Sequence, residues 1–435
     1  MTKPNAPEYV VSVDQLRVGV FIRIEGFSWF THPFVFRSFK LKSQEQIQTI
    51  KDLGISQVIC IPERSDVLPL RPEKQVDKAA ESAKPTPPKQ TTAIDRLWQI
   101  KRERAARLKQ KKERIVKCEQ QYTTSLKQVS SIMKGIASGS FQEVPQAINF
   151  VKELSEFFLA DMESTLHLMN LTATEERVYF HSLNVAVLSL MLGREAGLGL
   201  EEMNSLGIGA LFHDIGKSKI EKKILLKRTA LTKPEMAILF MHPKFGMEIL
   251  QKQKSVFPKA VSEIVYQHHE LCNGKGYPEK LTAEKISRLT KIVSIVNTYD
   301  NHCNKLEAQE SLTPYQALSF MFTQEKQWFD LNLLTVFIRC LGVYPPGSIV
   351  ALNNGAIGLV ISVNAVDPLY PSVLIYDPDI PKEEAIIVDL KEETDLKVEK
   401  SVRPAKLPEQ IFNYLSPRQR ITYYVDPTEK SKKRP

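Results

Sequence analysis

Cysteine is scarce in this sequence of 435 residues, and the five cysteines are scattered without a single Cys-x-x-Cys pair. The lack of paired cysteines argues against a structural zinc site, and such scattered cysteines are typical of reduced thiols. Long apolar runs are absent too: the longest, residues 185–192, is interrupted by Ser189 and is far shorter than the ~20 residues that a bilayer span requires. The first eight residues lack the apolar core of a secretory signal. We therefore expect a cytoplasmic protein without a transmembrane segment.

Charge is unevenly distributed along the chain. Nine Lys and Arg residues lie between Lys101 and Lys117, where only two Glu oppose them, so this segment carries most of the net charge of +9. Such a segment is either a solvated helix or a site for nucleic acid or a membrane surface, and the solvated helix is the more common case. We therefore predict no nucleic-acid partner. With 43% hydrophobic and 25% charged residues, the composition indicates a globular protein of roughly two to four compact units.

The chain divides into segments of different character. Apolar stretches alternate with turn residues up to about residue 66, which predicts a β-rich module, and a run rich in Pro, Lys and Ala follows. Apolar residues at 292, 295, 296 and 299 show the helical spacing that dominates the middle, and β-branched runs return after Gly347. The predicted segments are an N-terminal β-rich regulatory module (1–70), a Pro/Lys-rich linker (71–95), a basic connecting helix (96–144), a helical domain (145–345), a small β-barrel-like appendage (346–400) and a C-terminal tail (401–435).

Five of the eight histidines stand in contexts that suggest chemistry. His213 and Asp214 close the apolar run 206–212, so an imidazole and a carboxylate arrive together at the end of a buried helix. Burying that pair costs several kcal/mol unless the two groups are hydrogen-bonded or bound to a metal. Any one histidine is more often a satisfied core or surface residue. Together, imidazoles and a carboxylate suit iron, manganese or zinc, and they favour a catalytic metal centre.

The order of these motifs resembles the HD-GYP branch of the HD hydrolase superfamily over about residues 145–345. The motifs are His181-Ser-Leu-Asn-Val-Ala186, His213-Asp-Ile-Gly-Lys217, His242-Pro-Lys-Phe-Gly246, His268-His-Glu270 and Gly274-Lys-Gly-Tyr-Pro278. Lys227, Leu231-Thr232 and Glu235 also fit between them. The N-terminal module resembles the short domain of unknown function often found in front of such domains. The resemblance implies a mainly α fold: an HD-type all-helical catalytic domain, with a small β-rich module before it and a small β appendage after it.

The resemblance also implies which residues act. His242, His268 and His269 would bind one divalent ion and His181 and His213 a second, with Asp214 bridging the two. Asp214 and Lys217 would be the catalytic residues. The two metal ions that share Asp214 would activate a water for attack on phosphorus, while Lys217 holds a phosphate oxygen. Gly276, Tyr277 and Pro278 would contact substrate, although Gly and Pro equally indicate an ordinary surface turn. Iron or manganese is the expected metal.

Several positions depart from the family pattern. The helix that should supply a metal-binding aspartate carries Asn297, whose neutral carbonyl offers less to a second ion. The loop after Glu270 has Asn273 in place of an aspartate, and the Arg-Pro-Tyr segment expected after Asp300 is missing, which leaves Lys305 as an imperfect phosphate partner. Some members bind a third metal through a glutamate at the position of Arg177. At most two metals are therefore implied.

Two functions remain open on these residues. The first is metal-dependent hydrolysis of cyclic-di-GMP to pGpG, with GMP as a further product left open, in bacterial second-messenger signalling. The alternative is a degenerate module that binds cyclic-di-GMP or a partner protein without turnover. Retention of five histidines and Asp214 favours the phosphodiesterase, because a scaffold has no chemical need for them together. Expected partners are cyclic-di-GMP, other signalling domains and a second copy in a homodimer.

Overall fold

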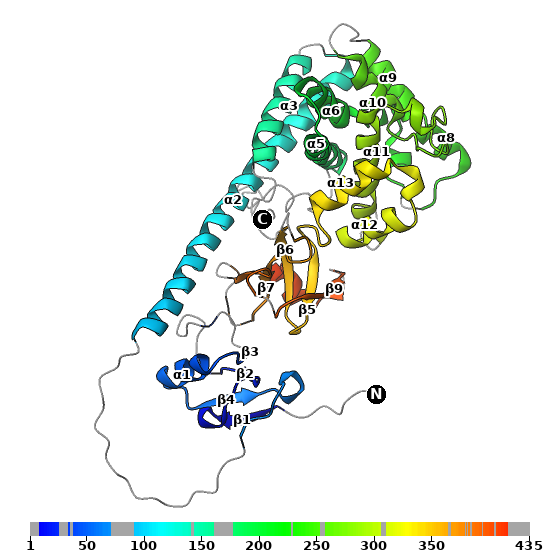
Figure 1. Ribbon diagram of the computed structural model, residues 1–435. Coiled ribbons are helices and arrows are strands. Elements are labelled where there is room, and N and C mark those ends of the chain that lie inside the picture. The colour runs from blue at the N-terminus through cyan, green and yellow to red at the C-terminus, as the bar shows by residue number, and fades with distance from the viewer. Residues whose placement is uncertain are drawn as a thin grey trace, which may run out of the picture. The chain divides into compact units, whose positions relative to one another are not determined.

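The computed structural model describes residues 8–25, 34, 38–70, 91–140, 143–160, 177–227, 229–252, 257–305, 310–363, 367–378, 380, 382, 385–393, 395–403 and 406–415. The chain forms two compact units. One comprises residues 1–110 with 378–380, and the other comprises 111–377 with 381–435. Figure 1 colours the elements in chain order. The predicted linker lies largely outside the described residues, as does the end of the predicted tail.

The N-terminal unit is built on a four-stranded antiparallel sheet. Its strands lie in the order β1-β4-β2-β3. Helix α1 lies between β3 and β4 in the sequence. Ser43 caps α1 by accepting a hydrogen bond from the backbone N–H of Gln46. Aliphatic side chains of the strands and of α1 make a small core of their own. The elements are β1 (Tyr9–Ser12), β2 (Phe21–Arg23), β3 (Ser38–Lys40), α1 (Gln44–Asp52) and β4 (Gln57–Cys60).

A 48-residue helix, α2 (Thr91–Ser138), follows in the sequence. In its C-terminal half, buried residues recur every three or four positions, which is the spacing of one helical face. These residues belong to the core of the helical domain: Cys118, Tyr122, Leu126, Val129, Ile132, Met133 and Ile136. The second half of α2 is therefore part of that domain's packing and not only a connection to it.

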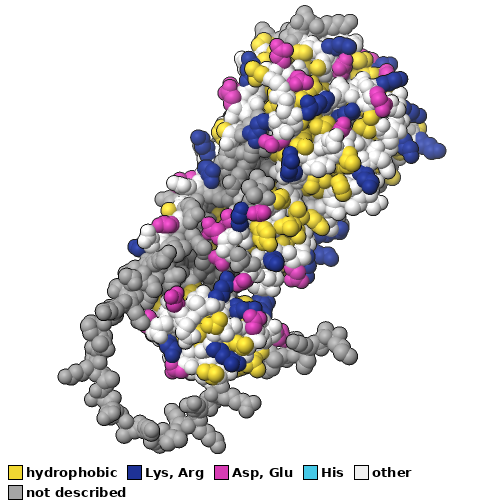
Figure 2. Space-filling model, viewed as in Figure 1, with side chains coloured by type: hydrophobic (Ala, Val, Ile, Leu, Met, Phe, Trp, Pro, Cys, Tyr) yellow, Lys and Arg dark blue, Asp and Glu magenta, His cyan; other side chains and the backbone are white. Residues whose placement is uncertain are grey.

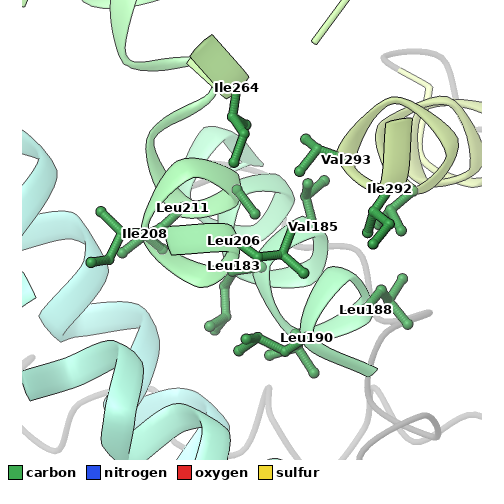
Figure 3. Packing of buried hydrophobic residues seen from close by; sticks show 14 of the residues in the cluster. Leu183, Val185, Leu188, Leu190, Leu206, Ile208, Leu211, Ile264, Ile292 and Val293 are labelled. Carbon is green, nitrogen blue, oxygen red and sulfur yellow. The ribbon is translucent and has the colours of Figure 1, made fainter. Parts of the chain in front are cut away.

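The helical domain surrounds one large apolar core. Its helices are α3 (Glu143–Ala160), α5 (Arg177–Glu195), α6 (Leu200–Phe212), α7 (Lys222–Leu225), α8 (Lys233–Leu239), α9 (His242–Gln251), α10 (Lys259–Gln267), α11 (Arg288–Cys303), α12 (Pro314–Thr323) and α13 (Leu331–Leu341). Helix α5 packs on α6 and α11, and α6 also packs on α3 and α10. Figure 3 shows the meeting of α5, α6 and α11 around Leu206, Val185 and Val293. A Cβ at Gly209 of α6 would lie 2.5 Å from Ile264, so glycine permits the close approach of α10.

A second antiparallel sheet follows the helices. Gly342 ends α13 with a φ of 74°, a conformation that glycine adopts without strain. The strands are β5 (Ile349–Leu352), β6 (Ile357–Ser362), β7 (Ser372–Ile375), β8 (Ile387–Asp389) and β9 (Val398–Val402), in the order β8-β7-β6-β5-β9. Helix α14 (Glu409–Leu415) packs on this sheet through Leu415. Strand β9 and α14 thus continue past residue 400, where the sequence predicts the tail to begin.

The predicted fold class, mainly helical with a small sheet towards each end of the chain, is confirmed. Within the described part of the chain, no helix is both long and apolar enough to cross a bilayer. On the face drawn in Figure 2, Lys and Arg side chains are interspersed with Asp and Glu over the described surface.

Candidate metal centre

Five histidines and one aspartate converge from four places in the helical domain. His181 lies in the second turn of α5, His213 and Asp214 follow α6 directly, His242 begins α9, and His268 and His269 follow α10. Gly216 lets these segments meet. A Cβ at that position would lie 2.0 Å from the backbone oxygen of His242, so only glycine allows the turn after Asp214 to rest against the start of α9.

The carboxylate of Asp214 lies at the centre of this group. Its Oδ2 is 3.5 Å from the Nε2 of His181 and 3.4 Å from the Nε2 of His213. Its Oδ1 is 3.3 Å from the Nε2 of His242 and 3.7 Å from the Nε2 of His268. Each oxygen therefore faces a different pair of imidazoles.

In four of these rings the Nδ1 atom is hydrogen-bonded to an oxygen other than those of Asp214. This bond determines whether the Nε2 atom of the same ring carries a proton or a lone pair. The Nδ1 atoms of His213, His242 and His268 lie 2.7, 2.7 and 2.9 Å from backbone carbonyl oxygens three residues earlier. The Nδ1 of His181 lies 2.6 Å from a carboxylate oxygen of Asp300. Because these oxygens accept only, each Nδ1 must carry the proton and donate. In the neutral rings each Nε2 then presents a lone pair to Asp214.

Burial keeps three of these imidazoles, those of His213, His268 and His269, in the ligating form. It lowers the pKa of His268 to about 3, although the nearby carboxylate of Asp214 works against it. Burial also lowers the pKa of His213, and burial together with the neighbouring imidazoles lowers that of His269 far below its usual value. Burial alone would raise the pKa of Asp214, but Lys217 and the adjacent imidazoles outweigh it and hold the pKa well below the usual range. At neutral pH Asp214 is thus an ionised carboxylate beside the neutral imidazoles of His213, His268 and His269.

The lone pairs that meet here have no proton between them. The Nε2 atoms of His181 and His213 are 3.1 Å apart, and so are those of His242 and His268. The Oδ1 of Asp214 is buried and has no hydrogen-bond partner. Such an arrangement is unfavourable unless a cation lies between the ligands. The residues form two sets of potential ligand atoms, and within each set all atoms lie within 4.8 Å of one another. One set is Asp214 with His242, His268 and His269, and the other is Asp214 with His181 and His213. The residues present therefore fit divalent metal ions.

Two stacked aromatic rings adjoin the centre at His269. The ring of Tyr277 stacks on His269 with ring centroids 4.5 Å apart, and the ring of Phe240 stacks on Tyr277 with ring centroids 4.4 Å apart. Phe240 retains 43% of its surface exposed. Gly276 is buried, and a Cβ there would lie 2.5 Å from the backbone oxygen of His269, so its place is explained by close packing of this loop. The Nζ of Lys217 lies 2.5 Å from the Oδ2 of Asp214.

Family comparison identifies this part of the chain. Residues 162–333 match the HD domain family, residues 9–147 match a domain of unknown function, DUF3391, and residues 349–410 match a KOW domain associated with HD domain. Residues 162–333 of this chain are thus an HD domain, and they carry the ordered motifs typical of the HD-GYP branch. The predicted resemblance is thereby confirmed, including the N-terminal domain of unknown function.

The curated relatives of this chain are named as phosphodiesterases of cyclic dinucleotides. A protein of Pseudomonas aeruginosa named cyclic di-GMP phosphodiesterase is 28% identical over 370 residues, 84% of each chain. The cyclic di-GMP phosphodiesterase response regulator RpfG of Xanthomonas campestris is 30% identical over 34% of this chain and 39% of its own. A 3'3'-cGAMP-specific phosphodiesterase of Vibrio cholerae is 28% identical over 37% of this chain and 30% of its own.

The remaining predicted site residues lie on or just after α11, and in the loop before it. The buried amide of Asn297 has its Oδ1 bonded to the Nδ2 of Asn301 at 2.8 Å. Lys305 is exposed, and its backbone N–H donates to Ser311. Pro278 is half-buried beside Tyr277. The substrate and ligand roles of these residues remain predictions.

Sequence reasoning overlooked two residues in or beside the candidate metal centre, Asp300 and Phe240. In the sequence, Asp300 served only to mark where the missing Arg-Pro-Tyr segment should follow, yet its carboxylate accepts a hydrogen bond from His181. Phe240 drew no attention, because an aromatic residue between apolar neighbours looks like a core residue. A signal for Asp300 was available, since a carboxylate three residues after Asn297 lies on the same face of a helix.

Proposed function

We propose that this chain hydrolyses a phosphodiester bond of cyclic-di-GMP, opening the ring to linear pGpG. The observation that carries the proposal is the buried Asp214 carboxylate, whose unpartnered Oδ1 and paired Oδ2 are surrounded by imidazole lone pairs. Relatives named cyclic di-GMP phosphodiesterases supply the substrate class. Further hydrolysis of pGpG to GMP requires a second turnover at the same centre.

Two divalent ions would be held by this chain, one by His242, His268 and His269 and one by His181 and His213, with Asp214 shared. Nitrogen and carboxylate ligands without cysteine suit iron or manganese. When bound, such a pair supplies Lewis acidity and lowers the pKa of an attacking water. The chain itself orients the imidazoles of His213, His242 and His268 through the carbonyl oxygens bonded to their Nδ1 atoms, which leave the lone pair on Nε2.

Lys217 serves two purposes in this proposal. Its ammonium group keeps Asp214 ionised, as the direction of the Asp214 pKa indicates. Its side chain is also 25% exposed, so that the cation borders the solvent side of the centre and can hold a phosphate oxygen as charge develops. Lys305 offers a second cation for the phosphates after α11.

The stacked rings of Tyr277 and Phe240 offer a surface for a guanine base. Bases stack on aromatic side chains at about 1–3 kcal/mol each, and Phe240 presents its exposed surface beside the metal-centre residue His269. Gly276 and Pro278 shape the loop that carries Tyr277. The base-binding role distinguishes a cyclic dinucleotide from a simple phosphodiester.

A second candidate, binding without turnover, is favoured by one observation. Asn297 replaces the carboxylate expected in the family, and its Oδ1 already accepts a hydrogen bond from Asn301. A second ion would then lack a compensating negative charge. A relative specific for 3'3'-cGAMP also makes that dinucleotide a substrate to be compared.

The test uses the full-length protein loaded anaerobically with Fe²⁺ or Mn²⁺. Cyclic-di-GMP and 3'3'-cGAMP are supplied separately, and pGpG and GMP are measured by chromatography alongside binding by calorimetry. Metal-dependent release of pGpG that is lost in Asp214→Asn supports the proposal. Tight binding of the dinucleotide with no product at either metal would establish the non-catalytic alternative.

The organisation of the chain completes the proposal. Residues 1–70 would act as a regulatory module, 96–144 as the connecting helix and 346–400 as an appendage to the catalytic domain of residues 145–345. Partner signalling domains and a homodimer are the expected assemblies. Light scattering of the full-length protein with and without cyclic-di-GMP tests the dimer.

A further inference from the structure

A chain of buried hydrogen bonds leads from helix α2 to the metal centre. The hydroxyl of Tyr122 donates to the Oδ1 of Asn184 over 2.5 Å, and the Nδ2 of Asn184 donates to the Oδ1 of Asp300 over 2.9 Å. The other oxygen of Asp300 accepts from the Nδ1 of His181 over 2.6 Å. Tyr122, Asn184 and Asp300 are each 2% exposed. Three helices, α2, α5 and α11, are linked in this way.

The chemistry of the four groups permits one direction of donation. A carboxylate accepts only, so Asn184 must turn its amide nitrogen to Asp300 and its oxygen to Tyr122. Burial, followed by the negative charge of Asp300, raises the pKa of Tyr122 well above its usual value, so the hydroxyl stays protonated. Asp300 must then accept from His181, which fixes the Nε2 of His181 as the lone pair that faces Asp214. Asn304 also donates to Asp300, over 3.0 Å.

We propose that Tyr122 and Asn184 are positioning residues which, through Asp300, set the orientation and tautomer of the metal ligand His181 and so couple helix α2 to the metal centre. The inference rests on the proposed function for the role of His181 as a ligand. Outer partners of a metal-bound histidine hold its ring in place and raise its basicity. Here the outermost partner belongs to the helix that follows the N-terminal module in sequence. A shift or rotation of α2 moves the Tyr122 hydroxyl and alters the bond that holds Asn184.

Packing supports the same coupling. The ring of Tyr122 lies 5.9 Å from that of Phe180, which directly precedes His181 on α5. Tyr122 is also one of the α2 residues within the helical core. The coupling therefore has both an apolar contact and a hydrogen-bonded path between α2 and the turn of α5 that carries His181.

The test measures metal binding and not turnover. Metal-free full-length protein is titrated with Mn²⁺ by calorimetry for wild type, Tyr122→Phe, Asp300→Asn and the double variant. Tyr299→Phe is the matched control, because it removes another buried hydroxyl from the same core, and that hydroxyl is hydrogen-bonded to Cys303 and not to a residue of the path. Thermal unfolding of each metal-free protein reports any general loss of stability.

Loss of an outer partner commonly costs about 10- to 100-fold in metal affinity, and we expect a loss of that order for Asp300→Asn. Tyr122→Phe, two bonds further out, should weaken only the site of His181 and His213, by about 3- to 10-fold, on the same scale. The double variant should bind no more weakly than Asp300→Asn, because both changes break one path. Tyr299→Phe should bind as wild type does.

Three results would overturn the inference: unchanged Mn²⁺ binding in Tyr122→Phe, equal losses in Tyr122→Phe and Tyr299→Phe, or fully additive losses in the double variant. Failure of the proposed function would look different. A wild type that binds two Mn²⁺ ions and does not cleave cyclic-di-GMP contradicts the phosphodiesterase and leaves the coupling of α2 to His181 intact.

Discussion

Asn301 donates a hydrogen bond from its Nδ2 to the Oδ1 of Asn297, one turn earlier on α11, over 2.8 Å. The carbonyl oxygen that Asn297 would offer to a metal is therefore already engaged. We predict that Asn297→Asp raises Mn²⁺ content towards two per chain and increases hydrolysis at limiting metal, because the second carboxylate oxygen supplies charge for the second ion.

The thermal stability of Asn297→Asp should change in opposite directions in the absence and in the presence of metal. A buried carboxylate destabilises the metal-free protein, and a bound cation restores its stability. Thermal unfolding with chelator and with Mn²⁺ measures both. Asn332→Asp makes the same chemical change at an exposed residue of α13 and should leave both values near wild type. Unaltered stoichiometry and rate in Asn297→Asp would show that this position lies outside the coordination sphere.

Asp214 is the group on which both sets of imidazoles converge. We predict that Asp214→Asn lowers turnover by more than about 100-fold, since loss of even an outer partner of a metal ligand costs about 10- to 100-fold. Helical content by circular dichroism should stay at the wild-type level, because the surrounding apolar core is unaltered. Retention of full metal content and activity would contradict a shared ligand at Asp214.

Phe240 should affect substrate binding and not phosphodiester chemistry. We predict that Phe240→Ala raises KM for cyclic-di-GMP about 5- to 30-fold, equivalent to about 1–2 kcal/mol of lost base stacking. Hydrolysis of bis(p-nitrophenyl) phosphate, which has no base, should be unchanged. Phe322→Ala removes a ring of similar exposure from α12 and serves as the control. Equal effects of Phe240→Ala on both substrates would argue against base stacking.

The metal-free protein should lose stability as pH falls below about 6.5. The folded protein holds the pKa of His268 at about 3, against 6.5 for a free imidazole, so the unfolded chain binds the proton first. The stability is present above pH 6.5 and declines as pH falls towards 3. Between pH 7.5 and 5.5 this one group removes about 1 kcal/mol, by linkage. Urea unfolding at both values measures the difference.

His268→Gln should reduce that pH dependence in the metal-free protein. Glutamine retains a polar side chain but does not titrate, so its stability difference between pH 7.5 and 5.5 should be smaller than that of wild type. An identical slope in the two proteins would mean that His268 does not titrate as its burial indicates.

Local sequence patterns predicted much of the helical domain. Apolar spacing on α11 indicated a helix with one buried face, and residues 292, 295, 296 and 299 are buried. The N-terminal module was predicted from apolar stretches that alternate with turn residues, and α1 was not anticipated within it. Its nine residues carry only two apolar side chains, both isoleucines, so the apolar periodicity was too weak to indicate a helix.

The histidine motifs and Asp214 could be recognised from sequence because each motif keeps its residues together within a few positions of the chain. The sequence by itself thus determined that the chain carries an HD-type set of nitrogen and carboxylate ligands, and that α2 is a helix. Only the tertiary structure decided that Tyr122, Asn184, Asp300 and His181 form one path, and that Phe240 lies beside Tyr277. These contacts join residues up to 119 positions apart, and they depend on how helices pack. Helical periodicity says which face is buried and does not say which partner that face meets.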